Sequence, residues 1–338
     1  MGTVLQPLIS ILLPVWNAAT TLSTCLQSVQ RQTEHRWQCI VVDDGSRDNS
    51  RLCAQQFADL DPRFQVIAAP HQGIVGALNT GLQYCHGRFI ARMDADDIMH
   101  RERLAVQMRV LDEHPSLAAV GCHVRIFPRR HLQNGRRAYE NWLNHITTVR
   151  RVQENAFVEC PIAHPSLMIR RDVLMSFPYR NCDWAEDYDL ILRLLSNGYA
   201  LSVVPQRLLS WRDGPKRLSR TNPTYALERF TACKADFLAK TFLLETSSYI
   251  LWGYGATGKA LRRALLAYGK QPAHIVELHP GRLGKVIHQA PVIPPERLIQ
   301  VPRRPVVISV AGVKPRGEIR AAMTQMGFVE LRDFVCAA

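Results

Sequence analysis

Short apolar runs, each the length of a β-strand, alternate with stretches of helical periodicity along the first hundred residues of this chain. The strand-like runs are Leu8–Pro14, Gln38–Val42, Phe64–Ala68 and Arg88–Met93. Alternation of this kind predicts an α/β fold in which helices cover both faces of a mostly parallel sheet. Because ligands of open α/β sheets bind beyond the carboxyl ends of the strands, the polar residues that follow these runs are the first candidates for a functional site.

The alternation begins again late in the chain. An amphipathic helix is predicted from Tyr225 to about Leu244, and a strand at Tyr249–Trp252 and a helix at Ala260–Tyr268 follow it. The 338 residues also exceed the usual length of a single domain. The sequence therefore predicts two domains, residues 1–245 and residues 246–338.

Composition limits the class of protein. Hydrophobic residues make up 47% of the chain and charged residues 21%, which is typical of a soluble globular protein. No apolar run approaches the ~20 residues of a membrane-spanning helix, and the amino-terminal segment lacks the pattern of a secretory signal, so a cytoplasmic protein is expected. The nine cysteines include no Cys-x-x-Cys pair, which argues against a disulfide framework and a zinc site.

The positive charge is concentrated in the predicted second domain. The whole chain has a net charge of +13, and residues 246–338 carry 13 Lys/Arg against 5 Asp/Glu, a net +8. A basic domain favours anionic partners. No basic helix with interleaved aromatic residues occurs, so nucleic acid is not expected as a partner. Peripheral association with the inner face of a membrane and a dimer contact both fit this charge, and the oligomeric state is left open.

Three carboxylates follow directly on the fourth strand-like run, in the sequence Arg92-Met93-Asp94-Ala95-Asp96-Asp97. If the strand geometry persists, Asp94 and Asp96 project to the same side of the sheet. Two oxygen ligands at a strand end suit Mg²⁺ or Mn²⁺, which would neutralise charge on a departing diphosphate. An acidic turn that leads into the next helix explains the same residues equally well.

Two further acidic pairs occupy positions where chemistry is expected. Asp43 and Asp44 follow the second strand-like run, where a carboxylate can accept hydrogen bonds from a base or a ribose, or can form an Asx turn. Glu186 and Asp187 open a predicted helix, where the free N–H groups favour a carboxylate whatever its function. An ionised carboxylate in such a defined position also suits a general base.

Taken in order, these segments resemble the signature of family 2 glycosyltransferases over roughly residues 7–220. The matching segments are Pro14–Asn17, Val42–Ser46, Asn79–Gly81, Ala91–Asp97, His164–Ser166 and Glu186–Asp187. The resemblance implies the GT-A fold, a mostly parallel sheet with flanking helices. It also implies transfer of a sugar, with inversion, from a nucleotide-diphosphate sugar to a hydroxyl of a glycan or a lipid-linked acceptor, in polysaccharide or glycoconjugate biosynthesis.

The resemblance assigns a role to each group of residues. Asp44, with Asp43 beside it, would bind the base of a donor such as a UDP-sugar, and Pro14 and Val15 would line the base pocket. Two further residues of the matching segments are assigned to the donor site: Asn79 and Arg92.

The metal and the base are assigned in the same way. Asp94 would contact the ribose or the metal, and Asp96 would be the principal ligand of Mg²⁺ or Mn²⁺. Asp187 would deprotonate the acceptor hydroxyl, with Glu186 beside it. A direct displacement needs no protein nucleophile.

One segment departs from the family pattern. Many relatives have a His shortly after an aromatic-Arg pair near the end of the catalytic domain, and this His completes the metal shell. Here Trp211-Arg212 is followed by Asp213. Either Asp213 ligates the metal, or Arg212, Lys216 and Arg217 hold the diphosphate, or the stretch is a solvated loop.

The predicted second domain contains a Gly-x-Gly-x-x-Gly motif. The glycines are Gly253, Gly255 and Gly258, and Glu277 lies where a ribose-binding acid would follow in a Rossmann-like domain. Glycines with this spacing can instead be required only for close packing of a strand against a helix, with no nucleotide bound. Since no acid–base pair lies nearby in the sequence, a structural or regulatory domain is favoured over a redox domain.

Three other functions are compatible with parts of the sequence. An NAD(P)-dependent oxidoreductase would act through the second domain. A nucleotidyltransferase would show a loop rich in glycine and basic residues after the first strand, whereas this chain has Val15–Ala19. A non-catalytic binding module would lack Asp96 or Asp187, and both are present.

Overall fold

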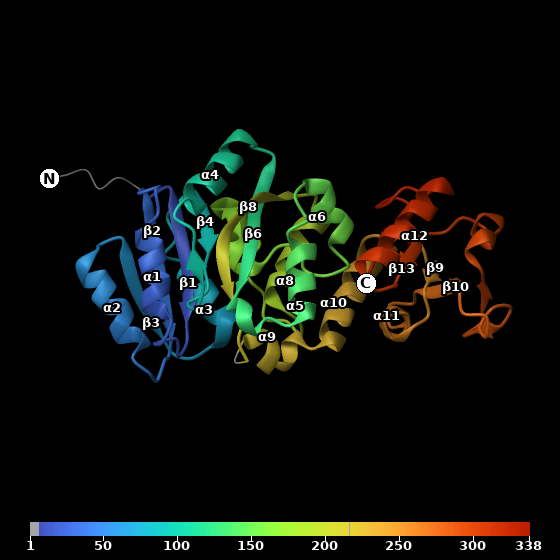
Figure 1. Cartoon of the computed structure of the whole chain (residues 1–338), viewed down its shortest axis with the longest axis horizontal. Coiled ribbons are helices and arrows are strands. Elements are labelled where there is room, and N and C mark those ends of the chain that lie inside the picture. The colour runs from blue at the N-terminus through green and yellow to red at the C-terminus, as the bar shows by residue number, and fades with distance from the viewer. Residues whose placement is uncertain (1–6, 216) are drawn as a thin grey trace. The chain divides into compact units, whose positions relative to one another are not determined.

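The computed structural model describes residues 7–215 and 217–338, and it divides the chain into two compact units (Figure 1). The first unit comprises residues up to 152, 162–182 and 193–217, and the second comprises residues 153–161, 183–192 and 218–338. Each unit is built around its own sheet. Among the described residues, no helix combines the length and the apolar character that crossing a bilayer requires.

The first unit contains an eight-stranded sheet in the order β3-β2-β1-β4-β7-β6-β8-β5. Its strands are β1 (Ile9–Val15), β2 (Trp37–Asp44), β3 (Phe64–Ala69), β4 (Phe89–Arg92), β5 (Ile98–Met99), β6 (Leu117–Phe127), β7 (Met168–Arg170) and β8 (Ala200–Arg212). Strands β1 to β4 are parallel, as the alternating sequence predicts.

The expectation of a mostly parallel sheet is met only in part, because the sheet is mixed. Strand β7 runs antiparallel to both β4 and β6, and β5 runs antiparallel to β8. β7 and β5 are the shortest strands of the sheet, and β5 follows β4 with no helix between them. The regular alternation of the first hundred residues therefore does not extend to the second half of the sheet.

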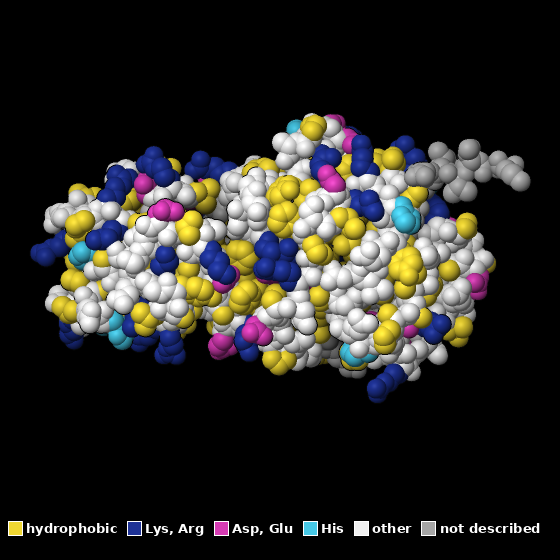
Figure 2. Space-filling model, turned by 180° about the vertical axis from the view of Figure 1, so that it is seen from behind, with side chains coloured by type: hydrophobic (Ala, Val, Ile, Leu, Met, Phe, Trp, Pro, Cys, Tyr) yellow, Lys and Arg dark blue, Asp and Glu magenta, His cyan; other side chains and the backbone are white. Residues whose placement is uncertain are grey.

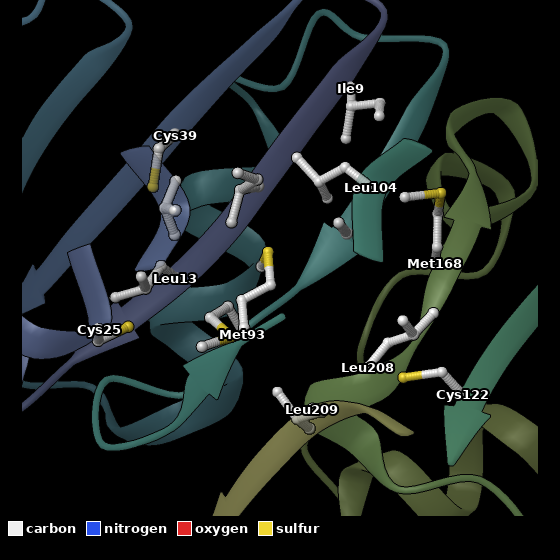
Figure 3. Packing of buried hydrophobic residues seen from close by; sticks show 14 of the residues in the cluster. Ile9, Leu13, Cys25, Cys39, Met93, Leu104, Cys122, Met168, Leu208 and Leu209 are labelled. Atoms are coloured by element: carbon white, nitrogen blue, oxygen red, sulfur yellow. The ribbon is translucent and has the colours of Figure 1, made fainter. Parts of the chain in front are cut away.

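The helices of this half of the chain are α1 (Leu22–Gln30), α2 (Ser50–Leu60), α3 (Gly73–Leu82), α4 (Arg103–Glu113), α5 (Asn134–Leu143), α6 (Val149–Asn155), α7 (Arg171–Ser176) and α8 (Glu186–Ser196). Every residue of β1 is buried, and α1 packs Leu22, Cys25 and Leu26 into the same core. Side chains from several strands meet there, as Figure 3 shows for Leu13, Met93 and their neighbours. This packing joins the strands of the first unit and α1 in one buried core.

The second unit contains a six-stranded sheet in the order β11-β12-β10-β9-β13-β14. Its strands are β9 (Ser248–Trp252), β10 (Gln271–Val276), β11 (Val286–Ile287), β12 (Ala290–Ile293), β13 (Val306–Ile308) and β14 (Phe334–Cys336). All neighbouring strands are parallel except β11 and β12. Its helices include α9 (Leu218–Thr221), α10 (Leu227–Lys240), α11 (Ala256–Leu266) and α12 (Val313–Gln325).

Helix α10 contributes to the core of the second sheet. Leu238 and Leu243, which lie before residue 245, share one buried cluster with Tyr249 and Leu251 of β9. The domain boundary at residue 245 stays a prediction. Helix α10 lies before this residue, whereas the strands whose core it completes lie after it.

Candidate functional site

Three carboxylates lie together beyond the end of β4. Asp94, Asp96 and Asp97 each offer an oxygen atom, and these atoms all lie within 4.8 Å of one another. The strand ends at Arg92 and the chain then turns, with the Asp97 N–H donating to the Asp94 carbonyl over 3.2 Å. The alternation assumed from the sequence therefore stops at Arg92, and the turn brings Asp97 beside the predicted pair.

Asp97 is a candidate residue that the sequence prediction missed. The signal was the third carboxyl in the run, which a strand geometry would have placed on the opposite side of the sheet. Its side chain is almost fully buried, and Oδ2 has no hydrogen-bond partner among the described residues. A buried oxygen in that state is costly unless a cation or a proton satisfies it.

The end of β8 holds this acidic turn in place. The Arg212 backbone N–H donates to Oδ1 of Asp97 over 2.7 Å, and Arg212 Nε donates to the Asp96 carbonyl over 2.7 Å. Arg92 forms an ion pair with Asp94. Arg212 and Arg92 therefore position the acidic turn. A role of Arg92 at the donor, which the resemblance implies, and a role of Arg212 at the diphosphate, which was one of three alternatives, would be additional to these contacts.

The pKa values of the three carboxyl groups are shifted in different directions. Burial and the neighbouring Asp94 charge raise the pKa of Asp96 to about 6. Burial, together with the charges of Asp94 and Asp96, also raises the pKa of Asp97 well above its usual value. Burial opposes ionisation of Asp94 as well, but Arg92, His164 and Arg217 together outweigh it and lower the pKa of Asp94. Two of the three groups thus lack a sufficient counter-charge in the protein.

These features fit a divalent cation. The donor atoms are all carboxylate oxygens, which Mg²⁺ and Mn²⁺ prefer. The unpartnered Oδ2 of Asp97 and the raised pKa of Asp96 both indicate negative charge that a bound cation would balance. The observed residues therefore fit the metal that the sequence predicts, with Asp97 as a third ligand.

The alternative ligand, Asp213, is engaged elsewhere. Its Oδ1 lies 3.4 Å from Arg136 Nε and 3.8 Å from Arg217 Nη1. Among the described residues it does not belong to the group that could hold a metal. The charge of Arg217 lowers the pKa of Asp94 and opposes the rise at Asp96, so this cation acts on the cluster. Lys216 lies outside the described residues.

The predicted base pocket lies at the ends of β1 and β2. Pro14 pairs with Val42 and Val15 pairs with Asp43 in parallel register. Asp43 Oδ1 accepts the Ser46 N–H over 3.3 Å, which stabilises the turn after β2 through a residue three positions on, one further than in an Asx turn. The residues assigned to the base therefore lie side by side, on neighbouring strands.

Asp44 stabilises the start of α3. Its Oδ1 accepts the Gln72 N–H over 2.7 Å and its Oδ2 accepts the Gly73 N–H over 3.0 Å. His71 Nδ1 lies 2.8 Å from the same Oδ2. Each carboxylate oxygen has two lone pairs, so these bonds orient Asp44 without using all its capacity to accept further donors.

An exposed aromatic pair stands beside Asp44. The Trp16 ring stacks on the His71 ring with centroids 4.7 Å apart and an angle of 17° between the planes. Trp16 remains 53% exposed, which is unusual for so large an apolar side chain. The sequence prediction did not single out either ring, although an aromatic residue directly after the β1 strand end was the available signal.

Asn79 has a structural role in this unit. Its Nδ2 donates to the Tyr179 carbonyl over 2.8 Å and its Oδ1 accepts the Tyr179 N–H over 3.2 Å. The Tyr179 hydroxyl lies 2.9 Å from Nε2 of His164, another residue of the matching segments. Since both polar atoms of the Asn79 amide are bonded within the protein, these contacts lend no support to its assignment as a donor ligand.

Glu186 and Asp187 belong to the second unit, in the first turn of α8. Glu186 is buried, and its Oε2 accepts the Tyr225 hydroxyl over 2.5 Å. Asp187 is only partly buried, and its Oδ1 accepts the Tyr188 N–H over 2.7 Å. Asp187 is therefore the more accessible carboxylate of the pair.

The glycine motif of the second unit serves packing. A Cβ on Gly258 would lie 2.2 Å from the Gly253 carbonyl oxygen, so β9 and α11 approach too closely for any side chain there. Glu277 accepts the Tyr254 N–H over 3.3 Å and pairs with Arg282 Nη1 at 2.7 Å. The carboxylate that would bind a ribose in a dinucleotide site is therefore bonded within the protein.

Comparisons with known proteins agree with this architecture. Residues 10–177 match the model of glycosyl transferase family 2. The chain is 28% identical over 215 residues to the amylovoran biosynthesis glycosyltransferase AmsE of Erwinia amylovora, covering 62% of this chain and 78% of that one. It is 39% identical over 105 residues to the Escherichia coli glucosyltransferase WfgD, covering 31% of this chain and 41% of that one.

Two solved structures share the fold. The Staphylococcus aureus protein TarS (residues 1–349), bound to UDP-GlcNAc, superposes with a TM-score of 0.56 at 15% identity, covering 77% of this chain and 72% of that one. The mannosyltransferase PcManGT of Pyrobaculum calidifontis, bound to GDP-Man and Mn²⁺, superposes with a TM-score of 0.51 at 19% identity, covering 78% and 73%. Enzymes of family 2 invert the transferred sugar, and most depend on a metal. The chain thus carries a family 2 glycosyltransferase domain of the GT-A type, and it is a nucleotide-sugar-dependent glycosyltransferase.

Proposed function

We propose that this enzyme transfers a sugar from a UDP-sugar to a hydroxyl of a glycan or lipid-linked acceptor, with Asp94, Asp96 and Asp97 as the metal-binding group. The observation that carries the proposal is the cluster of three carboxylates beyond β4, with the unpartnered oxygen of Asp97. The relative WfgD is described as a UDP-Glc:α-D-GlcNAc-diphosphoundecaprenol β-1,3-glucosyltransferase, which supports this donor and acceptor class. A lipid-linked acceptor would place the reaction at the cytoplasmic face of a membrane.

The donor would lie across the carboxyl ends of β1, β2 and β4. Asp44 would accept hydrogen bonds from the base, and the exposed Trp16 ring would stack on the base. Asp94, Asp96 and Asp97 would hold Mg²⁺ or Mn²⁺, which when bound supplies positive charge to the leaving diphosphate. Arg217, whose charge already acts on these carboxylates, would add to that stabilisation.

Asp187 would take the proton of the acceptor hydroxyl. As that proton leaves, the hydroxyl oxygen forms a bond to the anomeric carbon, and the bond from this carbon to the diphosphate oxygen breaks. A single displacement of this kind inverts the anomeric centre. The partial exposure of Asp187 and the hydrogen bond that engages Glu186 with Tyr225 support Asp187 as the base.

We also propose that the second unit is a Rossmann-like domain with a structural or regulatory role. In chain order its parallel strands lie third, second, first, fourth and fifth across the sheet, which is the doubly wound order. Oxidoreductase activity gains no support, because Glu277 is bonded to Arg282. Nucleotidyltransferase activity gains none either, because the loop after β1 carries Trp16 and Asn17 in place of a basic, glycine-rich loop.

Asp96→Asn tests the metal-binding assignment. Hydrolysis of a panel of nucleotide sugars would be measured with Mg²⁺ or Mn²⁺ and with excess EDTA. The variant and the EDTA-treated parent are both expected to lose turnover by about 10² or more, because a developing charge on the diphosphate would be left unbalanced. Asp59→Asn, the same substitution at an exposed position of α2, is the matched control and should keep parental activity. Parental turnover in Asp96→Asn, or none lost in EDTA, would contradict the proposal.

A further inference from the structure

A hollow with a cationic lining lies against the outer face of α11 in the second unit. Its volume is about 440 Å³. Three basic side chains reach it from one face of the helix, because residues 259, 262 and 263 are spaced by three and four positions. The remaining lining comes from the glycine-rich turn and from the β11–β12 hairpin. The full lining is Tyr254, Lys259, Arg262, Arg263, Ile287 and His288.

The cations of this hollow have no counter-charge among the residues that the structure describes. Within residues 7–215 and 217–338, no carboxylate forms an ion pair with Lys259, Arg262 or Arg263. Some other basic residues of the unit are paired, as Arg282 is with Glu277 and Lys240 is with Asp236. Over the second unit, toward the left of Figure 2, Lys and Arg side chains are scattered with few acidic side chains among them. Neighbouring like charges destabilise a helix unless a counter-ion binds.

Arg262 adds a second, independent sign of a missing partner. Its Nε atom is buried, and it has no hydrogen-bond partner among the residues that the structure describes. A guanidinium N–H in that position is costly unless an acceptor reaches it. An anionic oxygen in the hollow would supply both the acceptor and the charge.

A second hollow continues from the first. It has a volume of about 240 Å³, and it shares Arg262 and His288 with the cationic hollow. Its other lining residues combine apolar surface with side-chain amides: Leu266, Gln271, Pro272 and Gln289. The two hollows form one groove, defined here as the α11 groove, with a cationic end and a mixed apolar and amide end.

We propose that the α11 groove binds a diphosphate group that carries an organic substituent. Three cations match the charge of a diphosphate, the His288 ring offers a further polar contact, and the second hollow would take the first atoms of the substituent. This mode differs from dinucleotide binding at a glycine loop, because Gly253 and Gly258 are packed and Glu277 is bonded to Arg282. It requires no metal, and it leaves the three carboxylates beyond β4 for the donor. The diphosphate could come from a soluble molecule or from a lipid headgroup.

Binding to the full chain in excess EDTA tests this assignment, because EDTA removes metal-assisted binding at the carboxylates. The two probes are inorganic pyrophosphate, followed by calorimetry, and phosphatidylcholine vesicles with and without an isoprenyl diphosphate, followed by flotation. The double variant Lys259→Glu/Arg263→Glu is expected to weaken binding by about tenfold or more, since each lost charge-assisted contact is worth about that factor. Both residues are exposed, so the fold should survive.

The matched control is Arg297→Glu/Lys314→Glu, which makes the same charge change at exposed positions of the same unit outside the groove. It should change affinity by less than about twofold, as expected for charges that are screened by salt. Gly255→Ala should also retain binding, since no atom lies within 4 Å of its Cβ position and the groove contacts come from side chains.

The outcomes separate the two sources. Binding of pyrophosphate alone assigns the groove to a soluble diphosphate, and binding of the isoprenyl diphosphate vesicles alone assigns it to a lipid headgroup. Equal weakening in both double variants would overturn the assignment, and so would a parent protein that binds neither probe. Loss of binding in Gly255→Ala would contradict the assignment to the α11 groove and would indicate that the probe binds at the glycine turn. Nucleotide-sugar hydrolysis, measured in parallel, reports on the donor site alone.

Discussion

Asp97 has two separate tasks at its two carboxylate oxygens. Oδ1 accepts the backbone N–H of Arg212, whereas Oδ2 has no hydrogen-bond partner among the described residues. The first oxygen serves the fold, because it joins the acidic turn to the end of β8. The second is available to a cation. Substitutions that keep one task and remove the other can therefore separate stability from activity at this residue.

Asp97→Asn should remove activity and keep the fold. The amide oxygen can still accept the Arg212 N–H, but the side chain loses its charge. We expect turnover to fall by about 10² or more. The free energy of unfolding without metal should stay equal or rise by about 1 kcal/mol, since burial raises the pKa of this carboxyl and opposes its ionised form. Urea unfolding in EDTA and a donor hydrolysis assay check both.

Asp97→Ala is the matched comparison. It leaves the Arg212 N–H without its acceptor, so it should lower the free energy of unfolding by about 1–3 kcal/mol in addition to removing activity. Near-parental turnover in Asp97→Asn would show that Asp97 belongs to the fold alone.

Asp187→Asn tests the base at the same scale. The transfer rate should fall by about 10²–10⁴, which is the usual contribution of general base catalysis, while the KM for the donor stays unchanged. Glu186→Gln is the control, since a glutamine can still accept the Tyr225 hydroxyl. A parallel rise in donor KM for Asp187→Asn would place Asp187 at the donor instead.

The residues at strand ends were predictable, and those brought together by turns were not. Asp44 and Asp96 follow apolar runs, and the parallel part of the sheet places such residues at one edge. To predict that Asp97 joins the cluster, one must know that β4 ends at Arg92. The turn that follows is held by contacts from β8, which lies far away in the sequence. The stacking of Trp16 on His71 joins the ends of different segments, so local sequence carries no sign of it.

At the scale of elements, helix starts depend on residues far away in the chain. Helix α3 begins at Gly73, and the N–H groups of Gln72 and Gly73 at its start donate to the Asp44 carboxylate. Capping preferences concern residues that are next to a helix in the sequence, so they do not predict a cap supplied by a distant strand. The antiparallel direction of β7 was not predicted for a similar reason, because it is defined by pairing with the distant strands β4 and β6.

The strand–turn–helix of β9 and α11 offers a test with a matched control. Gly258→Ala should lower the free energy of unfolding by about 2 kcal/mol or more, because its Cβ would lie 2.2 Å from the Gly253 carbonyl oxygen and 2.7 Å from Ser309 Oγ. Gly255→Ala meets nothing within 4 Å and should cost at most about 1 kcal/mol. Thermal unfolding of the two variants measures the difference. Equal melting temperatures would mean that the motif is not held together by close packing.

At the scale of the whole molecule, sequence order and compact units do not coincide. Residues 153–161 and 183–192 belong to the second unit although they lie within the first 245 residues. The prediction of a second βαβ beginning near Tyr249 matches β9 and α11. The contribution of α10 could not be read from the sequence, because an amphipathic helix shows that it has a partner but not which sheet that partner is.

Cleavage at residue 245 should leave the two pieces associated. A protease site inserted between Glu245 and Thr246 would be cut in the folded protein, followed by size-exclusion chromatography. Leu238 and Leu243 of the first piece share a buried cluster with Tyr249 of the second, so the pieces should elute together. Cleaved protein with Leu238→Ala should separate more readily. Separation of the cleaved parent protein into two folded pieces would instead support a boundary at 245.

The bonds from Arg212 to the acidic turn also set an order of events during synthesis. They join residues 115 and 116 positions apart, so the turn that follows β4 leaves the ribosome long before the residue that fixes it. Contacts of such separation form late, because the intervening chain must be ordered first. A nascent or truncated chain that ends before residue 212 therefore holds all three carboxylates without their final geometry. The acidic turn reaches its final geometry only when the sheet that contains β8 is complete.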